Sequence, residues 1–434
     1  MTMGSIQEKV TASILAMIRA RRESAATLQG DASFLSSGGL APATIREASF
    51  SDFSAVSALK QRWGLAPDSS ENWQRLWRHN PALIHQNSDR PIGWVLEADG
   101  AVVGYMGNIF LLYRYGARTL TAVASHGLVI EPPYRAAGVS LVAAFYRQKS
   151  VDLYLTTTAI PSVGRIAQAF KSDALPQADY ETVLFWILKP YPFALEMMNK
   201  LEINPGLART GSALASLAIG MDKLLRRRWP TRGSILAVSK ITVNEIVEDD
   251  FHSLWTERVN EDPRLFADRS PDALRWHFNF PGDQGSTRIL CCWKDRELLG
   301  YAVLRHDPQP NGTQKSLVAD ILAKHDDPEV LRALLIAAYD DARSAGSYIL
   351  EVLGFPPKIR GVLLKWNPYL RKYPACPFYY KAADPVLHKA LAVGTAWYAT
   401  PFDGDTTLIR PSFLSCNPPL DAMSAQLMAS QFIN

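Results

Sequence analysis

The sequence predicts a mixed α/β chain with two similar domains in tandem, each a mixed, mostly antiparallel sheet flanked by helices. Its 434 residues are too many for one ordinary domain and suit two of about 200 residues each. In both halves, short apolar runs typical of strands alternate with helical stretches. The two halves also repeat one another, which is the third observation behind this prediction.

The repeat is visible in three residue pairs that stand in similar local sequence. The members of each pair are separated by 198, 199 and 196 residues: Asp52 and Asp250, Trp77 and Trp276, and Gly104 and Gly300. A nearly constant separation over three segments indicates a tandem duplication. In the first half, Asp99-Gly100 predicts a tight hairpin turn. We expect each half to close with strands of its own.

The predicted organisation follows from this repeat and from the composition between the repeats. Residues 23–43 are rich in Ser, Gly and Ala, as linkers are. The expected parts are an N-terminal helix and linker (residues 1–42), a first domain (43–190), an interdomain helical linker (191–237), a second domain (238–412) and a C-terminal tail (413–434).

Composition excludes several classes of protein. The chain is 47% hydrophobic and 20% charged, with a net charge of +4, which is globular and does not indicate nucleic-acid binding. The four cysteines lack metal-ligand or disulfide spacing and indicate reduced thiols: Cys291, Cys292, Cys376 and Cys416. No apolar run is long enough to span a bilayer, and the first residues do not read as a secretion signal. We therefore expect a cytoplasmic protein without a metal site.

The most informative segment is residues 128–148. An apolar run ends at Pro132, the pattern Arg135-x-x-Gly138-x-Ser140 follows, and a helical stretch begins after it. A strand that turns into a helix leaves backbone N–H groups unpaired near the positive end of the helix dipole, where a pyrophosphate fits. Gly138 lets the backbone approach such a ligand. The other small residues of the turn would not block it: Ala136, Ala137 and Ser140.

This segment resembles the coenzyme A-binding motif of the GCN5-related N-acetyltransferase (GNAT) superfamily. The family pattern is an apolar strand followed by Val-x-Pro-x-Tyr/Phe-Arg-x-x-Gly-x-Gly/Ala. The matching residues are Ile130, Pro132, Tyr134, Arg135 and Gly138, and Ser140 replaces the last small residue. The resemblance implies acetyl-coenzyme A or another acyl-coenzyme A as co-substrate. The residues that it assigns to binding are Leu128, Val129, Ile130, Arg135, Ala136, Ala137, Gly138, Val139 and Ser140.

Two catalytic residues are proposed from the sequence. His126 lies two residues before Leu128, so strand alternation puts both on one face, and a histidine suits proton abstraction from an amine. The alternatives are a satisfied, half-buried His126 or a base at Glu131. GNAT enzymes often carry a tyrosine as acid where this chain has Phe170, which has no hydroxyl. Tyr180 is a substitute for it, or a packing residue at the start of the following strand.

The second half lacks the phosphate turn. It has Lys324-His325-Asp326-Asp327-Pro328-Glu329 in its place, and these carboxylates would repel a pyrophosphate. We expect that this half does not bind coenzyme A.

The resemblance implies N-acyl transfer, in the family's usual form N-acetyl transfer, from acyl-coenzyme A to a small-molecule amine such as an amino sugar or a cell-envelope precursor. Two alternatives stay open: a non-catalytic acyl-coenzyme A-binding protein in a biosynthetic complex, and an aminoacyl-tRNA-dependent ligase of the cross-bridge type. Residues 207–230 join an apolar helix face to a basic cluster. That segment predicts either peripheral contact with an anionic membrane or a packed interdomain helix.

Overall fold

A computed structural model describes residues 41–408 except 66, 87–89, 158–160, 231–235, 282, 284, 310 and 373–377. The predicted N-terminal helix and C-terminal tail lie outside the described residues. The described residues from Ala43 onward belong to one compact unit.

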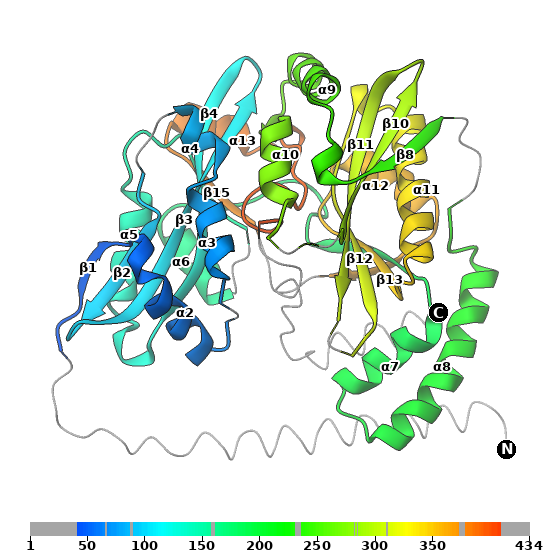
Figure 1. The fold of residues 1–434 in the computed structure, drawn as a ribbon, viewed down its shortest axis with the longest axis horizontal. Coiled ribbons are helices and arrows are strands. Elements are labelled where there is room, and N and C mark those ends of the chain that lie inside the picture. The colour runs from blue at the N-terminus through cyan, green and yellow to red at the C-terminus, as the bar shows by residue number, and fades with distance from the viewer. Residues whose placement is uncertain are drawn as a thin grey trace. The chain divides into compact units, whose positions relative to one another are not determined.

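Two mixed sheets form the centre of this unit (Figure 1). The first has the order β1-β2-β3-β4-β5-β15-β6, with β9 paired to the end of β3. Its strands are β1 (Thr44–Glu47), β2 (Gly93–Ala98), β3 (Ala101–Tyr115), β4 (Arg118–Ile130), β5 (Leu153–Thr156), β6 (Asp173–Ala174), β9 (Leu265–Ala267) and β15 (Tyr379–Ala382).

The second sheet repeats this order as β8-β10-β11-β12-β13-β7-β14. Its strands are β7 (Thr182–Ile187), β8 (Ala237–Ile241), β10 (Thr287–Lys294), β11 (Glu297–Pro308), β12 (Gln314–Ala323), β13 (Ile349–Val352) and β14 (Tyr369–Lys372). In each sheet one central pair is parallel, β4 with β5 and β12 with β13, and the other pairs are antiparallel. The predicted fold class is confirmed.

Helices pack against both sheets (Figure 1). They are α2 (Phe53–Arg62), α3 (Ser70–Trp77), α4 (Pro81–Gln86), α5 (Gly138–Tyr146), α6 (Pro161–Ala169), α7 (Pro190–Lys200), α8 (Pro205–Leu225), α9 (Glu248–Glu261), α10 (Pro271–Phe278), α11 (Pro328–Ser344), α12 (Pro357–Leu364) and α13 (Pro385–Leu391). Many of them begin with proline, whose fixed φ suits the first helical position and whose missing N–H costs nothing there. No helix in the described part of the chain is long and apolar enough to cross a membrane.

The predicted hairpin between β2 and β3 is confirmed. Asp99 and Gly100 have φ angles of 49° and 73°, the left-handed conformation that a type I′ turn requires. Asp and Gly tolerate this conformation better than other residues.

The two halves exchange their closing strands, which differs from the expectation that each half closes its own sheet. β7, from the first half, pairs with β13 and β14 in the second sheet. β15, from the second half, pairs with β5 and β6 in the first sheet. An apolar strand fits either sheet equally well locally, so its sequence does not select the partner. The exchange means that neither sheet is built from residues 43–190 or 238–412 alone.

Candidate active site

The site is built around the end of β4, where this strand leaves β5. The parallel pairing of the two strands covers only Ala122 to Ala124 on β4. The hydroxyls of Ser125 and Thr156 then bridge the strands at 3.0 Å. From there to Ile130, no described strand pairs with that edge of β4. Its backbone groups on this side are therefore available to a ligand.

A β-bulge interrupts the same stretch of β4. Tyr105 on β3 pairs with Val129 and Gly107 pairs with His126, so Gly127 and Leu128 together lie opposite one residue. Gly127 has a φ of 61°, which a glycine adopts without strain. Bulges re-aim side chains and often lie beside active sites.

The bulge corrects the predicted face of His126. Directly opposed residues of paired strands share a face, and Tyr105 and Gly107 lie two apart on one face of β3. Their partners, Val129 and His126, therefore share a face, and Leu128 does not belong to it. Val129 is buried, whereas Leu128 and Ile130 are half-buried.

His126 lies between two buried carboxylates. Its Nδ1 is 3.2 Å from Oδ2 of Asp405, and its Nε2 is 3.6 Å from Oδ2 of Asp68, an ion-pair distance too long for a hydrogen bond. Lys60 Nζ donates to Asp68 at 2.8 Å, and Thr157 Oγ1 donates to Asp405 at 2.5 Å. With His126 protonated, this cluster holds two cations and two anions.

The electrostatics of the cluster favour charged side chains. Burial and the charge on Lys60 lower the pKa of His126, but its contacts with Asp405 and Asp68 outweigh them and raise it. Burial opposes ionisation of Asp68, yet its contacts with His126 and Lys60 prevail and hold the pKa of this carboxyl well below its usual range. His126 is therefore a stronger base than a free histidine, and it loses its proton only at higher pH.

Two buried polar atoms at the bulge lack a hydrogen-bond partner among the described residues: His126 Nε2 and Tyr105 Oη. Buried polar groups in native proteins are nearly always bonded, so these two atoms are candidate contacts for a substrate. The two residues are close, because a Cβ on Gly107 would lie 2.6 Å from Tyr105 Oη and 3.3 Å from His126 Cβ.

The turn after β4 is exposed, as a ligand site must be. Arg135, Ala136, Val139 and Ser140 are exposed, and α5 begins at Gly138 without a side-chain cap. The N–H groups of Ala137, Gly138 and Ser140 already donate to carbonyls within the turn. In the part of the chain that the structure describes, those of Ala136 and Val139 make no backbone hydrogen bond. Fewer backbone N–H groups are thus available to bind a pyrophosphate than the sequence suggested.

Gly138 has a packing role that the sequence did not reveal. A Cβ at this position would lie 2.1 Å from Cδ1 of Ile130, so the end of this half-buried side chain would have to move to make room for it. Glu131, the alternative base, is ion-paired with Arg62 at 2.7 Å.

The equivalent helix start in the second half is already filled. Asp327 caps α11, its Oδ1 accepting from the N–H of Glu329 at 2.8 Å. Asp326 is buried and bound by the guanidinium groups of Arg258 and Arg264. A carboxylate of the chain itself thus lies where a pyrophosphate would bind.

The open edge of the second sheet is also filled. β12 runs past its pairing with β13 from Ala319 to Ala323, and these residues are fully buried. The hydroxyl of Tyr398 donates to the Ile321 carbonyl at 2.6 Å, and Asp320 is bound by Arg269. The segment after β15 therefore fills the edge of β12 in the second sheet, whereas the equivalent edge of β4 in the first sheet has no described strand beside it.

Tyr180 and Phe170 have the contacts of core residues. Tyr180 is buried, packs edge-on against Phe378, and donates to the Thr400 carbonyl at 3.4 Å. Phe170 stacks on Tyr146, whose hydroxyl is 2.8 Å from Ser172 Oγ. The assignment of Tyr180 as the acid stays a prediction.

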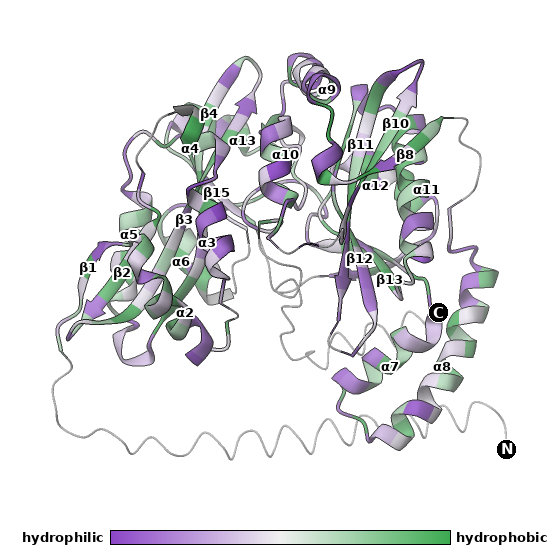
Figure 2. Cartoon of the chain, viewed as in Figure 1, coloured by the Kyte–Doolittle hydropathy of each residue, from purple (hydrophilic) through white to green (hydrophobic). Residues whose placement is uncertain are grey.

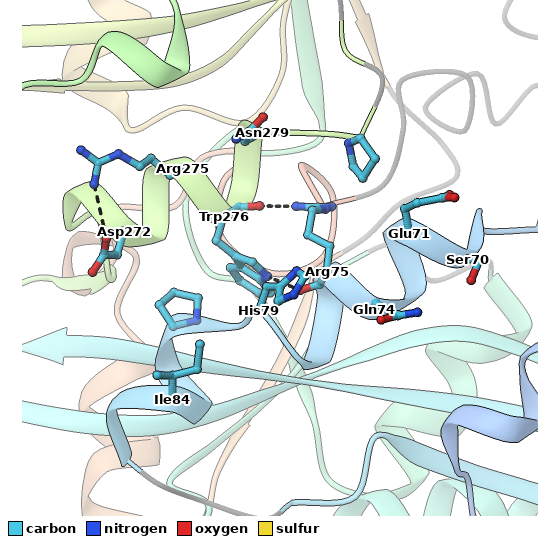
Figure 3. A pocket seen from close by; sticks show the side chains of 12 residues that line it. Ser70, Glu71, Gln74, Arg75, His79, Ile84, Asp272, Arg275, Trp276 and Asn279 are labelled. Atoms are coloured by element: carbon cyan, nitrogen blue, oxygen red, sulfur yellow. Dashed lines mark hydrogen bonds and ion pairs between the residues drawn. The ribbon is translucent and has the colours of Figure 1, made fainter.

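A pocket of about 730 Å³ lies between α3 and α4 on one side and α10 on the other (Figure 3). Arg75 donates to the carbonyls of Trp276 and of Leu408, and Trp276 Nε1 donates back to the Arg75 carbonyl at 2.8 Å. The lining includes polar and charged side chains from both halves: Glu71, His79, Asp272 and Arg275. Asp68 precedes α3 by two residues and Asp405 precedes Leu408 by three, so both carboxylates of the cluster are close in sequence to residues at this pocket.

Two solved structures resemble this arrangement. A GCN5-related N-acetyltransferase from Anabaena variabilis ATCC 29413 matches with a TM-score of 0.51 at 10% identity, over 79% of this chain and 73% of that one. A conserved protein of unknown function from Enterococcus faecalis V583, described as a probable N-acyltransferase, matches with a TM-score of 0.50 at 8% identity, over 79% and 72%. The chain has the GNAT fold. No protein-family model matches the sequence, and no curated protein matches it.

Within this GNAT fold, sequence reasoning missed the partners of His126. Lys60 and Asp68 belong to a helix and a loop with no recognisable motif. Asp405 follows His126 by 279 residues, and Phe402-Asp403-Gly404-Asp405 reads as an ordinary turn. The only sequence signal was a pair of acidic residues in an otherwise apolar segment.

Proposed function

We propose that the chain is an acyl-coenzyme A-dependent N-acyltransferase that acts on a small-molecule amine. The observation that carries the proposal is the open, bulged edge of β4, which leads directly into the exposed turn at residues 135–140. The first sheet keeps this edge open, whereas the second sheet fills its own with Tyr398. GNAT-fold chains named as N-acyltransferases support the proposal at the level of the fold.

In this proposal, different residues of the first half bind the pyrophosphate, the pantetheine and the thioester. The N–H groups of Ala136 and Val139 and the guanidinium of Arg135 hold the pyrophosphate at the positive end of α5. The backbone of Leu128 to Ile130 lies along the pantetheine and thioester, with an N–H of this edge as the oxyanion donor.

His126 is the proposed base. The amine nitrogen attacks the thioester carbonyl carbon, the carbon–sulfur bond breaks, and the amine loses one proton while the thiolate gains one. His126 Nε2, unbonded among the described residues, accepts the proton from the amine, while Asp405 orients the ring through Nδ1. The thiolate takes its proton from Tyr180 or from water.

The acceptor that we propose enters through the pocket between α3 and α10. A protonated amine suits the carboxylates of Glu71 and Asp272, which line this pocket. An amino sugar or a cell-envelope precursor offers an amine beside polar groups that Arg275 and His79 can bind.

The variant Ser140→Asp tests the binding site without disturbing packing. Ser140 is exposed in the first turn of α5, where a carboxylate suits the helix dipole, so thermal stability is expected to hold. The same carboxylate lies near the proposed pyrophosphate. Two unit charges about 4 Å apart repel by roughly 1–4 kcal/mol between water and an effective dielectric of 20. Calorimetry should show acetyl- or longer acyl-coenzyme A binding weakened by roughly fivefold to several hundredfold.

The matched control is Val386→Asp, which adds the same charge to the exposed first turn of α13 and leaves binding unchanged. Unchanged affinity in Ser140→Asp would refute the pyrophosphate site. Binding without thiol release across a panel of amines would refute catalysis and leave a non-catalytic acyl-coenzyme A-binding protein.

A further inference from the structure

Helix α8 turns its large apolar side chains outward, opposite to the usual orientation in a surface helix. Such helices normally turn large apolar residues inward and polar residues outward. The inward face of α8 instead carries mostly small residues, with Ala208 and Ser212 buried and Gly211 against Met198 of α7. Only Ile219 is both large and buried, in a small core with Phe193.

The large apolar residues of α8 form a stripe on the outside. Its members are Leu207, Leu214, Leu217, Met221, Leu224 and Leu225, each between 65% and 77% exposed. Steps of seven, three, four and three residues keep the first five on one helix face, opposite the buried one. In the hydropathy colouring, α8 carries hydrophobic as well as hydrophilic residues along its length (Figure 2). Monomeric soluble proteins rarely expose so continuous an apolar patch without a partner.

The charges around the stripe indicate what covers it. Arg209, Arg226 and Arg227 are exposed along its flank and end. The acidic residue of α8 is Asp222, which is half-buried and bound by Arg226, Arg228 and Tyr369. A surface of apolar side chains bordered by cations complements anionic headgroups above acyl chains. A second copy of the chain would instead bring arginines against arginines.

We propose that the outer face of α8 binds the surface of an anionic lipid bilayer, with the leucine stripe at the acyl boundary. This inference does not depend on the proposed acyl transfer. In the structure, one arginine of the basic cluster predicted from sequence is not exposed. Arg228 is buried, donates to the carbonyls of Asn367 and Pro368, and lies over the ring of Tyr369. Reversing its charge would unfold the region, so the leucines give the cleaner test.

The experiment is sedimentation of the full chain with vesicles of phosphatidylcholine, with and without phosphatidylglycerol. The wild-type chain should sediment with the mixed vesicles, less at high salt, and weakly with phosphatidylcholine alone. The double variant Leu217→Glu, Leu224→Glu should bind the mixed vesicles at least about tenfold more weakly, since the change removes apolar contact and adds repulsion. Both leucines are exposed, so circular dichroism and Tm should match the wild type.

The matched control is Val386→Glu with Val393→Glu, two exposed apolar residues outside α8 that are 77% and 55% exposed. It adds the same charge and should sediment like the wild type. The proposal is overturned if the wild type stays in the supernatant, if the α8 variant sediments equally, or if binding does not require phosphatidylglycerol. A wild-type dimer that the α8 variant abolishes, without lipid binding, would assign the stripe to a second copy instead.

Discussion

Replacing Asp405 with asparagine tests the base that we assign to the first half. The Asp405 side chain is fully buried and contacts His126 Nδ1 and Thr157 Oγ1. Asparagine keeps the size and one acceptor oxygen but removes the charge. The variant therefore separates the electrostatic effect on His126 from a change in packing.

The expected loss of stability follows from the contacts that weaken. A hydrogen bond to a charged group contributes about 1.5–3 kcal/mol, so the free energy of unfolding should fall by roughly that amount. The loss depends on pH. Because the pKa of His126 is raised in the folded state, its contribution is fully present below the unfolded pKa of about 6.5 and disappears as pH rises through the folded pKa. The destabilisation by Asp405→Asn should therefore be larger at acidic than at alkaline pH.

The assay is the pH dependence of kcat/KM for thiol release. A neutral His126 is needed to accept the amine proton, so the wild-type rate should rise with pH, with a midpoint above that of an ordinary histidine. Asp405→Asn removes a contact that raises the pKa of His126, so its midpoint should move to lower pH.

The control is Asp341→Asn, which removes a carboxylate 3.0 Å from His306 Nε2 in the second half. It should cost comparable stability and leave the midpoint in place. An unchanged midpoint in Asp405→Asn, or an equal shift in Asp341→Asn, would refute His126 as the base.

Two further predictions concern the fold. Gly138→Ala should lower Tm only slightly, because its Cβ would meet Cδ1 of Ile130, the end of a half-buried side chain that can move aside. The loss should be smaller still in an Ile130→Val background, which lacks that atom, when the two changes are compared in a double-mutant cycle. Residues 43–190 and 238–412 expressed separately should each fail to unfold cooperatively, because each lacks a strand of its own sheet. When the two fragments are co-expressed, size-exclusion chromatography should recover a complex. Cooperative unfolding of either fragment alone would contradict the strand exchange.

Much of the fold was predictable because local rules determine it. The hairpin at Asp99-Gly100 depends on residues that tolerate positive φ, and the strand before Pro132 depends on an apolar run. The exchange of β7 and β15 was not predictable, because pairing partners are chosen by the tertiary structure. The segment Thr182–Ile187 is buried almost throughout, so no polar face marks which sheet it joins.

The site was predictable only in part for the same reason. His126 and the turn at Arg135 belong to one strand and its continuation, so sequence order brings them together. The carboxylates on either side of His126 come from the loop before α3 and from the last described segment of the chain. The bulge at Gly127 was hidden as well, since an extra residue in a strand changes which side chains share a face without changing composition.

The C-terminal segment makes the edges of the two sheets different although their strands have the same order. In the second half, Tyr398 fills the open edge of β12, and Thr400 and Asp403 bind Arg269 beside it. Five residues after Thr400, the same segment reaches the first half, where Asp405 binds His126. One stretch of chain thus closes the edge of one sheet and completes the cluster at the edge of the other. On this arrangement the second half is required for the activity that we propose without binding coenzyme A, because it supplies the carboxylate that orients the base and the strand β15 that closes the first sheet.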